Sequence, residues 1–260
     1  MSETLDPTHL DLARRFVAGH PPRGELLLCA VTGSHIYGFS SPDSDIDLKG
    51  IHQVPTRDLL GFAGVAETHD RLQVFEGVEC DLTTHELRKA LGLLLGGNGN
   101  MLERIESPIQ LHETAALAEL RALSKGARST RFVRHYAGFF KGMCREHERS
   151  AAPRAKTLLY AYRVALTGAH LLATGELECD LRRLAPAHGF GEALELVAYK
   201  AAADEKAAVP PDVDARHRAN WPRLEAYLDA ARDRSPLPAE PANVAACEAW
   251  LVERRLAAMG

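Results

Sequence analysis

Apolar and polar residues follow two different patterns along this chain, one in its first hundred residues and another in the rest. Residues 25–32 form a nearly continuous apolar run that ends at Gly33, which is typical of a buried strand. Residues 46–51 and 78–82 alternate between apolar and polar positions, as strands with one buried face do. Residues 7–18 carry apolar positions at helical spacing, with Asp6 placed to cap the helix. The first part therefore predicts mixed helix and strand.

Strand patterns vanish after Thr84, and helical patterns replace them. The helices are expected at about 86–95, 113–124, 129–149, 155–174 and 241–258. Glycines at 96, 97 and 99 end the first of these, and prolines at 210–211 and 236–238 separate later ones. We predict an α+β protein, with a small α/β domain at 1–97 followed by a helical domain at 98–260.

Composition narrows the class of protein. The 260 residues are 46% hydrophobic and 25% charged, which excludes a disordered chain, a fibrous repeat or a disulfide miniprotein. No apolar run approaches the roughly 20 residues that span a bilayer, and the acidic amino terminus is unlike a signal peptide. Five scattered cysteines without a C-x-x-C pair fit neither a disulfide framework nor a zinc site. We expect a globular cytoplasmic protein that does not bind membranes.

Charge is distributed unevenly along the sequence. The whole chain has a net charge of −4, but residues 121–163 hold eleven Lys and Arg against two Glu, a net charge of +9. Such a segment is the usual electrostatic signature of a polyphosphate or nucleic-acid partner. The alternative is a solvated helix face whose charge is matched by acids elsewhere in the fold.

Two acids near the start of a predicted strand suggest a metal site. Asp45 and Asp47 are two residues apart, so their carboxylates project from one face, about 6.6 Å apart along the backbone. Two such anions repel unless a cation lies between them, and hard oxygen ligands favour Mg²⁺ or Mn²⁺. Asp81 or Glu79, which share a face of the later strand, offers a third carboxylate. The alternative for the pair is a solvent-facing strand start.

The residues before these acids suggest a phosphate site. Gly33 lets a ligand approach the backbone closely, Ser34 adds a hydroxyl donor, and a helix that starts after Ser34 would direct free N–H groups at a phosphate. A phosphate cradle opposite a carboxylate pair is what metal-dependent phosphoryl or nucleotidyl transfer requires. The histidines show no zinc-ligand spacing and no Gly-x-Ser-x-Gly motif is present, so zinc chemistry and acyl hydrolysis are disfavoured.

The pattern of Gly33-Ser34, then Asp45-Ile46-Asp47, then Asp81 resembles the DNA polymerase β superfamily of nucleotidyltransferases. A closer resemblance, to a bacterial and phage group of minimal nucleotidyltransferases linked to RNA repair, is carried by Tyr37-Gly38, the 41–45 segment, Lys49-Gly50, Asn98 with Glu103, and Lys156–Gly175. Gly99 stands where that group has proline, so the resemblance does not predict the conformation of the turn there.

The resemblance implies a polymerase β-like catalytic domain with a small mixed sheet at 1–97 and a helical nucleotide- and acceptor-binding domain at 98–260. It implies that Asp45, Asp47 and Asp81 bind Mg²⁺ or Mn²⁺, with Asp81 helping to deprotonate the attacking hydroxyl. It places Gly33, Ser34 and Ser44 at the nucleotide. Lys156, Tyr160 and Arg163 share one helix face and are expected to contact the nucleotide, unless they form an ordinary charged face.

The leading hypothesis is a Mg²⁺-dependent transferase that moves a nucleoside monophosphate from a nucleoside triphosphate (NTP) to an acceptor hydroxyl and releases pyrophosphate. An RNA 3′ end is the favoured acceptor, because the basic segment suits RNA better than a cationic antibiotic. Alternatives are a protein hydroxyl, as in antitoxin-type AMP transfer, or a small molecule. A non-catalytic nucleotide- or RNA-binding module is the alternative of another class, and the intact acids count against it. The preferred NTP and the oligomeric state stay open.

Overall fold

The chain forms two compact units. A computed structural model describes residues 5–41, 44–62, 64–202 and 208–259. Unit 1 comprises residues 1–35, 44–128 and 241–260, and unit 2 comprises residues 36–43 and 129–240. Pro42 and Asp43, in the turn expected from the sequence, lie outside the described residues. The boundary at 97/98, between a catalytic domain and a nucleotide- and acceptor-binding domain, stays a prediction.

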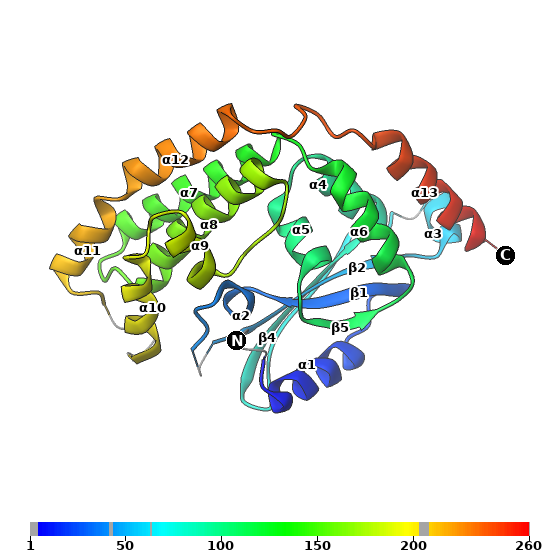
Figure 1. The fold of residues 1–260 in the computed structure, drawn as a ribbon. Coiled ribbons are helices and arrows are strands. Elements are labelled where there is room, and N and C mark those ends of the chain that lie inside the picture. The colour runs from blue at the N-terminus through cyan, green and yellow to red at the C-terminus, as the bar shows by residue number, and fades with distance from the viewer. Residues whose placement is uncertain (1–4, 42–43, 63, 203–207, 260) are drawn as a thin grey trace. The chain divides into compact units, whose positions relative to one another are not determined.

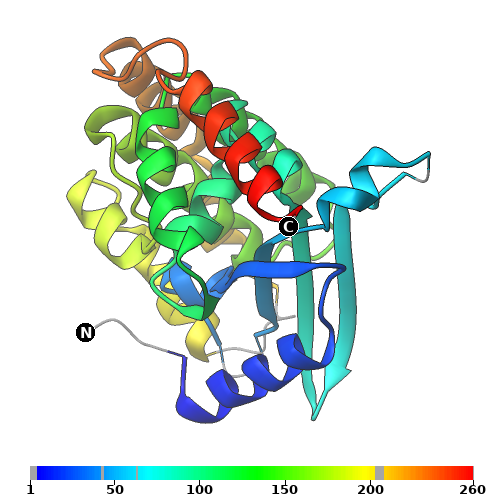
Figure 2. The ribbon, with the colours of Figure 1, turned by 90° about the vertical axis from the view of Figure 1, so that its right-hand side faces the viewer.

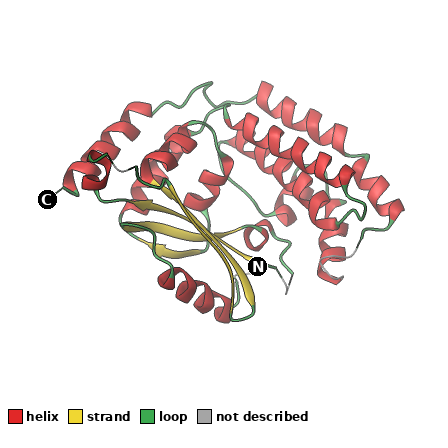
Figure 3. Cartoon of the chain, turned by 180° about the vertical axis from the view of Figure 1, so that it is seen from behind, coloured by secondary structure: helices red, strands yellow, loops and turns green. Residues whose placement is uncertain are grey.

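A mixed five-stranded sheet forms the centre of unit 1 (Figure 3). Its strands are β1 (Glu25–Thr32), β2 (Ile46–Gln53), β3 (Thr68–Phe75), β4 (Val78–Glu86) and β5 (Gln110–Glu113), in the order β3-β4-β2-β1-β5. β2 and β4 run parallel, and every other neighbouring pair runs antiparallel. The protein is therefore α+β with a small mixed sheet, as predicted.

Helix α1 (Pro7–Gly19) covers one face of this sheet (Figure 1). The carboxylate of Asp6 accepts hydrogen bonds from the backbone N–H groups of Thr8 and His9, which confirms the expected cap. The buried positions of α1 pack against the inward side chains of three strands; these are Leu12, Ala13, Phe16 and Val17 against Cys29, Val31, Ile46, Leu48, Cys80 and Leu82. Because strand side chains alternate, the polar residues between them project from the opposite face.

Four helices lie on the other side of the sheet. They are α4 (Leu87–Leu95), α5 (Gly99–Glu106), α6 (Ala116–Ala127) and α13 (Val244–Ala257), while α2 (Ser34–Tyr37) and α3 (Thr56–Leu60) are short. The C-terminal helix α13 packs against α4 and α6 (Figure 2). Asn98 caps α5, because its Oδ1 accepts a hydrogen bond from the backbone N–H of Met101.

Two strands lack a signal in the sequence. β3 is an edge strand on which half of the side chains are exposed and none is buried, so it has no continuous apolar face. β5 corrects the expectation that no strand follows Thr84. Its four residues pair with β1, about eighty positions earlier in the chain, and its burial is slight. Both strands form because a neighbouring strand satisfies their backbone groups, which local periodicity cannot reveal.

Unit 2 is helical. It contains α7 (Phe132–Arg149), α8 (Ala155–Thr174), α9 (Leu181–Ala187), α10 (Ala193–Ala202), α11 (Pro211–Arg218) and α12 (Trp221–Asp233). α8 is buried on nearly all sides and contacts α7, α9, α10 and α12, so it is the core helix of this unit. Among the helices of the described ranges, none combines the length and the apolar character that crossing a membrane requires.

Candidate active site

The register of two strands brings Asp47 and Asp81 together. β2 and β4 are parallel neighbours, and Asp47 lies directly opposite Asp81. Both side chains are on the face of the sheet that α1 does not cover. Glu79 instead pairs with Val74 of the edge strand and is exposed. Of the two candidates for a third carboxylate, Asp81 is therefore the one beside Asp47.

A lysine lies between these two carboxylates. Lys49 Nζ is 2.7 Å from Oδ2 of Asp81 and 3.5 Å from Oδ1 of Asp47. Burial raises the pKa of Asp47, and the negative charges of Asp45 and Asp81 raise it further, while Lys49 lowers it. The two carboxylates thus concentrate negative charge, and the Lys49 ammonium compensates part of it.

Gly33 closes one side of this site. Its φ of +69° lies in the left-handed region, and a Cβ atom there would be 2.0 Å from Oδ2 of Asp47. Any other residue would strain the backbone and displace the Asp47 carboxylate. The glycine is therefore needed by the protein itself, in addition to any role in admitting a phosphate.

Ser34 presents a polar atom that the described protein leaves unpaired. Its side-chain oxygen is enclosed and has no hydrogen-bond partner among the described residues, and the residue is 4% exposed. An enclosed polar group without a partner calls for an explanation, and a bound ligand is one such explanation. The expected helix after Ser34 is a single turn, α2, and the contact of its N–H groups with a phosphate stays a prediction.

His35 ties the two halves of the motif together. Its Nε2 donates a hydrogen bond to the backbone carbonyl of Asp45, at 3.1 Å, so the chain leaving β1 is linked to the chain entering β2. Ser44, one of the expected nucleotide contacts, is buried. His35 therefore has a positioning contact within the motif.

The donor set is suited to a hard divalent cation, although it is smaller than expected. Asp47 and Asp81 offer carboxylate oxygens, which Mg²⁺ and Mn²⁺ prefer, and the Lys49 ammonium between them shows that the position attracts positive charge. Within the described ranges, no three His, Cys, Asp or Glu side chains cluster closely enough to hold a metal ion. Asp45 contributes its charge to this pair.

The middle of the motif, residues 36–41, belongs to unit 2 and is held by its helices. The Arg163 guanidinium lies over the ring of Tyr37, 3.8 Å from its centroid, and Tyr160 packs edge-on against Tyr37 at 5.8 Å. Lys200, buried on α10, donates a hydrogen bond to Ser41 Oγ at 2.8 Å. These contacts fix the segment that follows Ser34 in the chain.

Asp180 completes this support and was not predicted. A Cβ atom at Gly38, where φ is +78°, would lie 2.0 Å from Oδ1 of Asp180. That carboxylate also caps α9 and pairs with Arg182. The left-handed glycine could have been suspected from the Tyr37-Gly38 dipeptide, but its distant partner could not.

The three residues expected to contact a nucleotide all lie on α8. Lys156 and Tyr160 are half-buried, and Arg163 is buried against Tyr37. The predicted helix is confirmed, since α8 spans Ala155–Thr174. Their contact with a nucleotide stays a prediction, and Arg163 has a packing role besides it.

The basic segment is divided between the units and partly neutralised. Arg128 pairs with Glu106 in unit 1, while Arg131 with Glu240 and Lys141 with Glu225 pair in unit 2. Arg145, Arg149 and Arg154, near the end of α7 and the start of α8, are exposed and have no ion pair within the described parts of the chain. The same holds for Lys125 in unit 1 and Arg134 at the start of α7, so the excess charge of this segment is spread over several positions, three of which lie close together in the sequence.

A comparison with protein families agrees with the motif. The family model RlaP, described as the RNA repair pathway DNA polymerase beta family, matches residues 11–253. An uncharacterized protein of Methanocaldococcus jannaschii, MJ0002, is 24% identical over 232 residues, which cover 88% of this chain and 94% of that protein. A solved nucleotidyltransferase-like protein from Exiguobacterium sibiricum is 13% identical, covers 85% of this chain and 75% of its own, and gives a TM-score of 0.35.

Proposed function

This chain belongs to the RNA repair pathway DNA polymerase beta family, and we propose that it is a Mg²⁺- or Mn²⁺-dependent nucleotidyltransferase. In this proposal it transfers a nucleoside monophosphate from an NTP to an acceptor hydroxyl and releases pyrophosphate. The favoured acceptor is an RNA 3′ end.

One observation carries the proposal: Asp47 and Asp81 lie side by side next to Gly33 and the unpaired hydroxyl of Ser34. A binding protein gains nothing from placing carboxylates beside a phosphate site, because their charges repel. A transferase needs them, because a divalent cation held there supplies Lewis-acid stabilisation of the phosphoryl charge. Asp47 and Asp81 are the residues that would hold it, and Asp45 would add its negative charge.

The other residues have roles that follow from their chemistry. Ser34 donates its hydroxyl hydrogen to a phosphate oxygen, and Gly33 leaves the space that the Asp47 carboxylate occupies. Asp81 accepts the proton of the attacking hydroxyl as the new oxygen–phosphorus bond forms at the α-phosphorus. The bond from that phosphorus to the pyrophosphate oxygen breaks, and pyrophosphate leaves with its electron pair. His35 keeps Asp45 in register with the Gly33-Ser34 turn.

The test is incubation of the protein with Mg²⁺ or Mn²⁺, each labelled NTP, and RNA, DNA, total protein or no acceptor. We expect label on RNA, pyrophosphate in equal amount, and no product when the RNA 3′ hydroxyl is blocked. Asp47→Ala should abolish transfer while leaving the thermal unfolding temperature close to wild type, because it relieves repulsion. Label on protein instead of RNA would favour the antitoxin-type alternative.

A second candidate, a nucleotide- or RNA-binding module without catalysis, is favoured by Lys49. Its ammonium already compensates Asp81, so the site is stable without a metal ion. This candidate expects NTP binding with no pyrophosphate release under any cation. Pyrophosphate release that depends on Asp47 would exclude it.

A further inference from the structure

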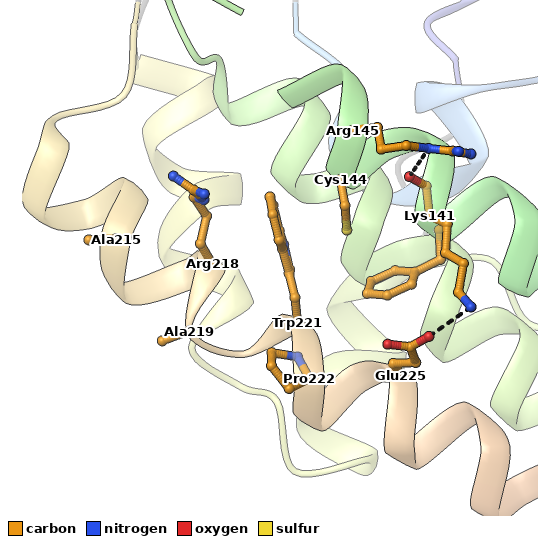
Figure 4. A pocket seen from close by; sticks show the side chains of 10 residues that line it. Lys141, Cys144, Arg145, Ala215, Arg218, Ala219, Trp221, Pro222 and Glu225 are labelled. Atoms are coloured by element: carbon orange, nitrogen blue, oxygen red, sulfur yellow. Dashed lines mark hydrogen bonds and ion pairs between the residues drawn. The ribbon is translucent and has the colours of Figure 1, made fainter. Parts of the chain in front are cut away.

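Unit 2 contains a pocket whose lining residues are suited to a single-stranded nucleic acid. A cavity of about 690 Å³ lies between α7, α11 and α12, and its apolar walls include Phe140, Trp221 and Pro222 (Figure 4). Its size is in the range of ordinary ligand pockets. The whole lining belongs to unit 2.

Trp221 gives this cavity a planar wall. Arg218 lies over one side of the indole, 5.3 Å from the ring centroid, and in Figure 4 Trp221 stands between Arg218 and Cys144. The face directed towards Cys144 therefore borders the cavity. An aromatic face beside a guanidinium is a typical platform for a stacked base in single-stranded nucleic acids.

A second hollow of about 550 Å³ adjoins the first, since Arg145 lines both. Arg149 and Arg154 line it as well, and one exposed acid, Glu146, does too, so the lining carries three positive charges against one negative charge. None of the three guanidinium groups has an acidic partner in the described part of the chain, although other exposed arginines of this unit do. Three guanidinium groups without an acidic partner around one pocket are suited to phosphodiester groups.

The acid in the first cavity is also explained by such a ligand. Glu225 would repel a phosphate, but its Oε1 is 2.9 Å from Lys141 Nζ, so its charge is compensated (Figure 4). A compensated carboxylate remains an acceptor for a hydroxyl group. A ribose 2′-hydroxyl supplies that donor and deoxyribose does not.

We propose that this surface, made of the Trp221 cavity and the Arg145–Arg149–Arg154 hollow, binds single-stranded RNA by stacking one base on Trp221 and pairing phosphates with the three arginines. The proposal rests on the proposed function for the assignment to RNA, and it adds a binding site that the catalytic motif does not include. It is independent of NTP and metal, since all its residues lie outside the carboxylate site.

The test uses the intrinsic fluorescence of Trp221. The protein has two tryptophans, and Trp250 lies in unit 1, hydrogen-bonded to Glu119, so Trp250→Phe leaves Trp221 as the only tryptophan, which is excited selectively at wavelengths that tyrosine does not absorb. This variant is titrated with oligo(U) and with oligo(dT) of equal length, without NTP or divalent cations, at several salt concentrations. We expect saturable quenching by oligo(U), tighter than by oligo(dT). A log–log salt slope of about −2 corresponds to three phosphate contacts.

Two variants and one control separate the contributions. Trp221→Leu should weaken RNA binding, followed by anisotropy of a labelled strand, by about fivefold to 150-fold. Replacing Arg145, Arg149 and Arg154 by Gln should bring the salt slope near zero. The matched control replaces Arg216, Arg223 and Arg232, which are exposed in the same unit but paired with acids, and should leave the slope near −2.

Absence of quenching at low salt, tighter binding of oligo(dT), or equal losses in the arginine variant and its control would each overturn the proposal. Its failure is distinguishable from failure of the proposed function. RNA that is labelled by the enzyme but does not quench Trp221 removes this surface alone. RNA that quenches Trp221 but is never labelled removes the transferase alone.

Discussion

Gly33 and Asp47 face each other so closely that a Cβ atom on Gly33 would lie 2.0 Å from the Asp47 carboxylate. The glycine that opens the motif is thus in contact with the second acid of Asp45-Ile46-Asp47 across β1 and β2, where Thr32 is the register partner of Asp47. A substitution at Gly33 would displace the Asp47 carboxylate as well as obstruct a phosphate. A loss of activity in such a variant therefore has two possible causes.

The phosphate site is tested more cleanly at Ser34. Ser34→Ala should weaken NTP binding by about tenfold to 150-fold, the effect of one hydrogen bond to a charged group, and should not lower the free energy of unfolding. The reason is that Ser34 Oγ has no partner to lose among the described residues. Calorimetric NTP titration and urea unfolding measure the two effects.

Gly33→Ala is the companion variant. It should lower the free energy of unfolding by more than about 1 kcal/mol, because φ is +69° and the Asp47 carboxylate must move.

For the Ser34 variant, the contradicting outcome is NTP binding as tight as in wild type, which would show that the triphosphate lies elsewhere.

The identity of the third carboxylate is tested by a pair of substitutions. Asp81→Asn should reduce nucleotidyl transfer by about 100-fold or more, as loss of a group that stabilises transition-state charge does. Glu79→Gln, on the same face of β4 but exposed, should change the rate by no more than about twofold. Steady-state pyrophosphate release measures both, and the opposite ranking would assign the role to Glu79.

Lys49 predicts how the carboxylates respond to cations. Lys49→Met removes the charge shared by Asp47 and Asp81, so the two anions repel and the unfolding temperature without metal should fall. Added Mg²⁺ or Mn²⁺ should then raise that temperature more than in wild type. Lys125→Met, an exposed lysine of the same unit, is the control. An equal response to cations in all three proteins would show that no metal binds at this pair.

The role of Arg163 is tested by its coupling to Tyr37. The guanidinium lies 3.8 Å from the ring centroid, so Arg163→Met, Tyr37→Leu and the double variant should reveal a coupling of about 1–2 kcal/mol in urea unfolding. A direct nucleotide ligand would behave differently: Arg163→Met would raise the KM for NTP and show no coupling to Tyr37.

The sequence determined the elements that have strong local patterns. α1 with its Asp6 cap, the buried strand β1, the alternating strands β2 and β4 and the long helices α7 and α8 were predicted close to their observed bounds. Alternation also determined that Asp81 and Glu79 share one face, because the side-chain period of a strand is two. The motif around Gly33, Ser34, Asp45 and Asp47 indicated the family that the comparison then showed.

Only the tertiary structure decided which of these residues meet. That Asp81 and not Glu79 lies beside Asp47 depends on the register between β2 and β4, whose pairing no local pattern specifies. The edge strands β3 and β5 exist because their neighbours bond to them. Likewise, the sequence shows that residues 121–163 contain eleven Lys and Arg, but it does not show which of them form ion pairs. Arg128 and Lys141 pair with acids outside this segment. Which arginines remain available to a ligand is therefore a property of the fold.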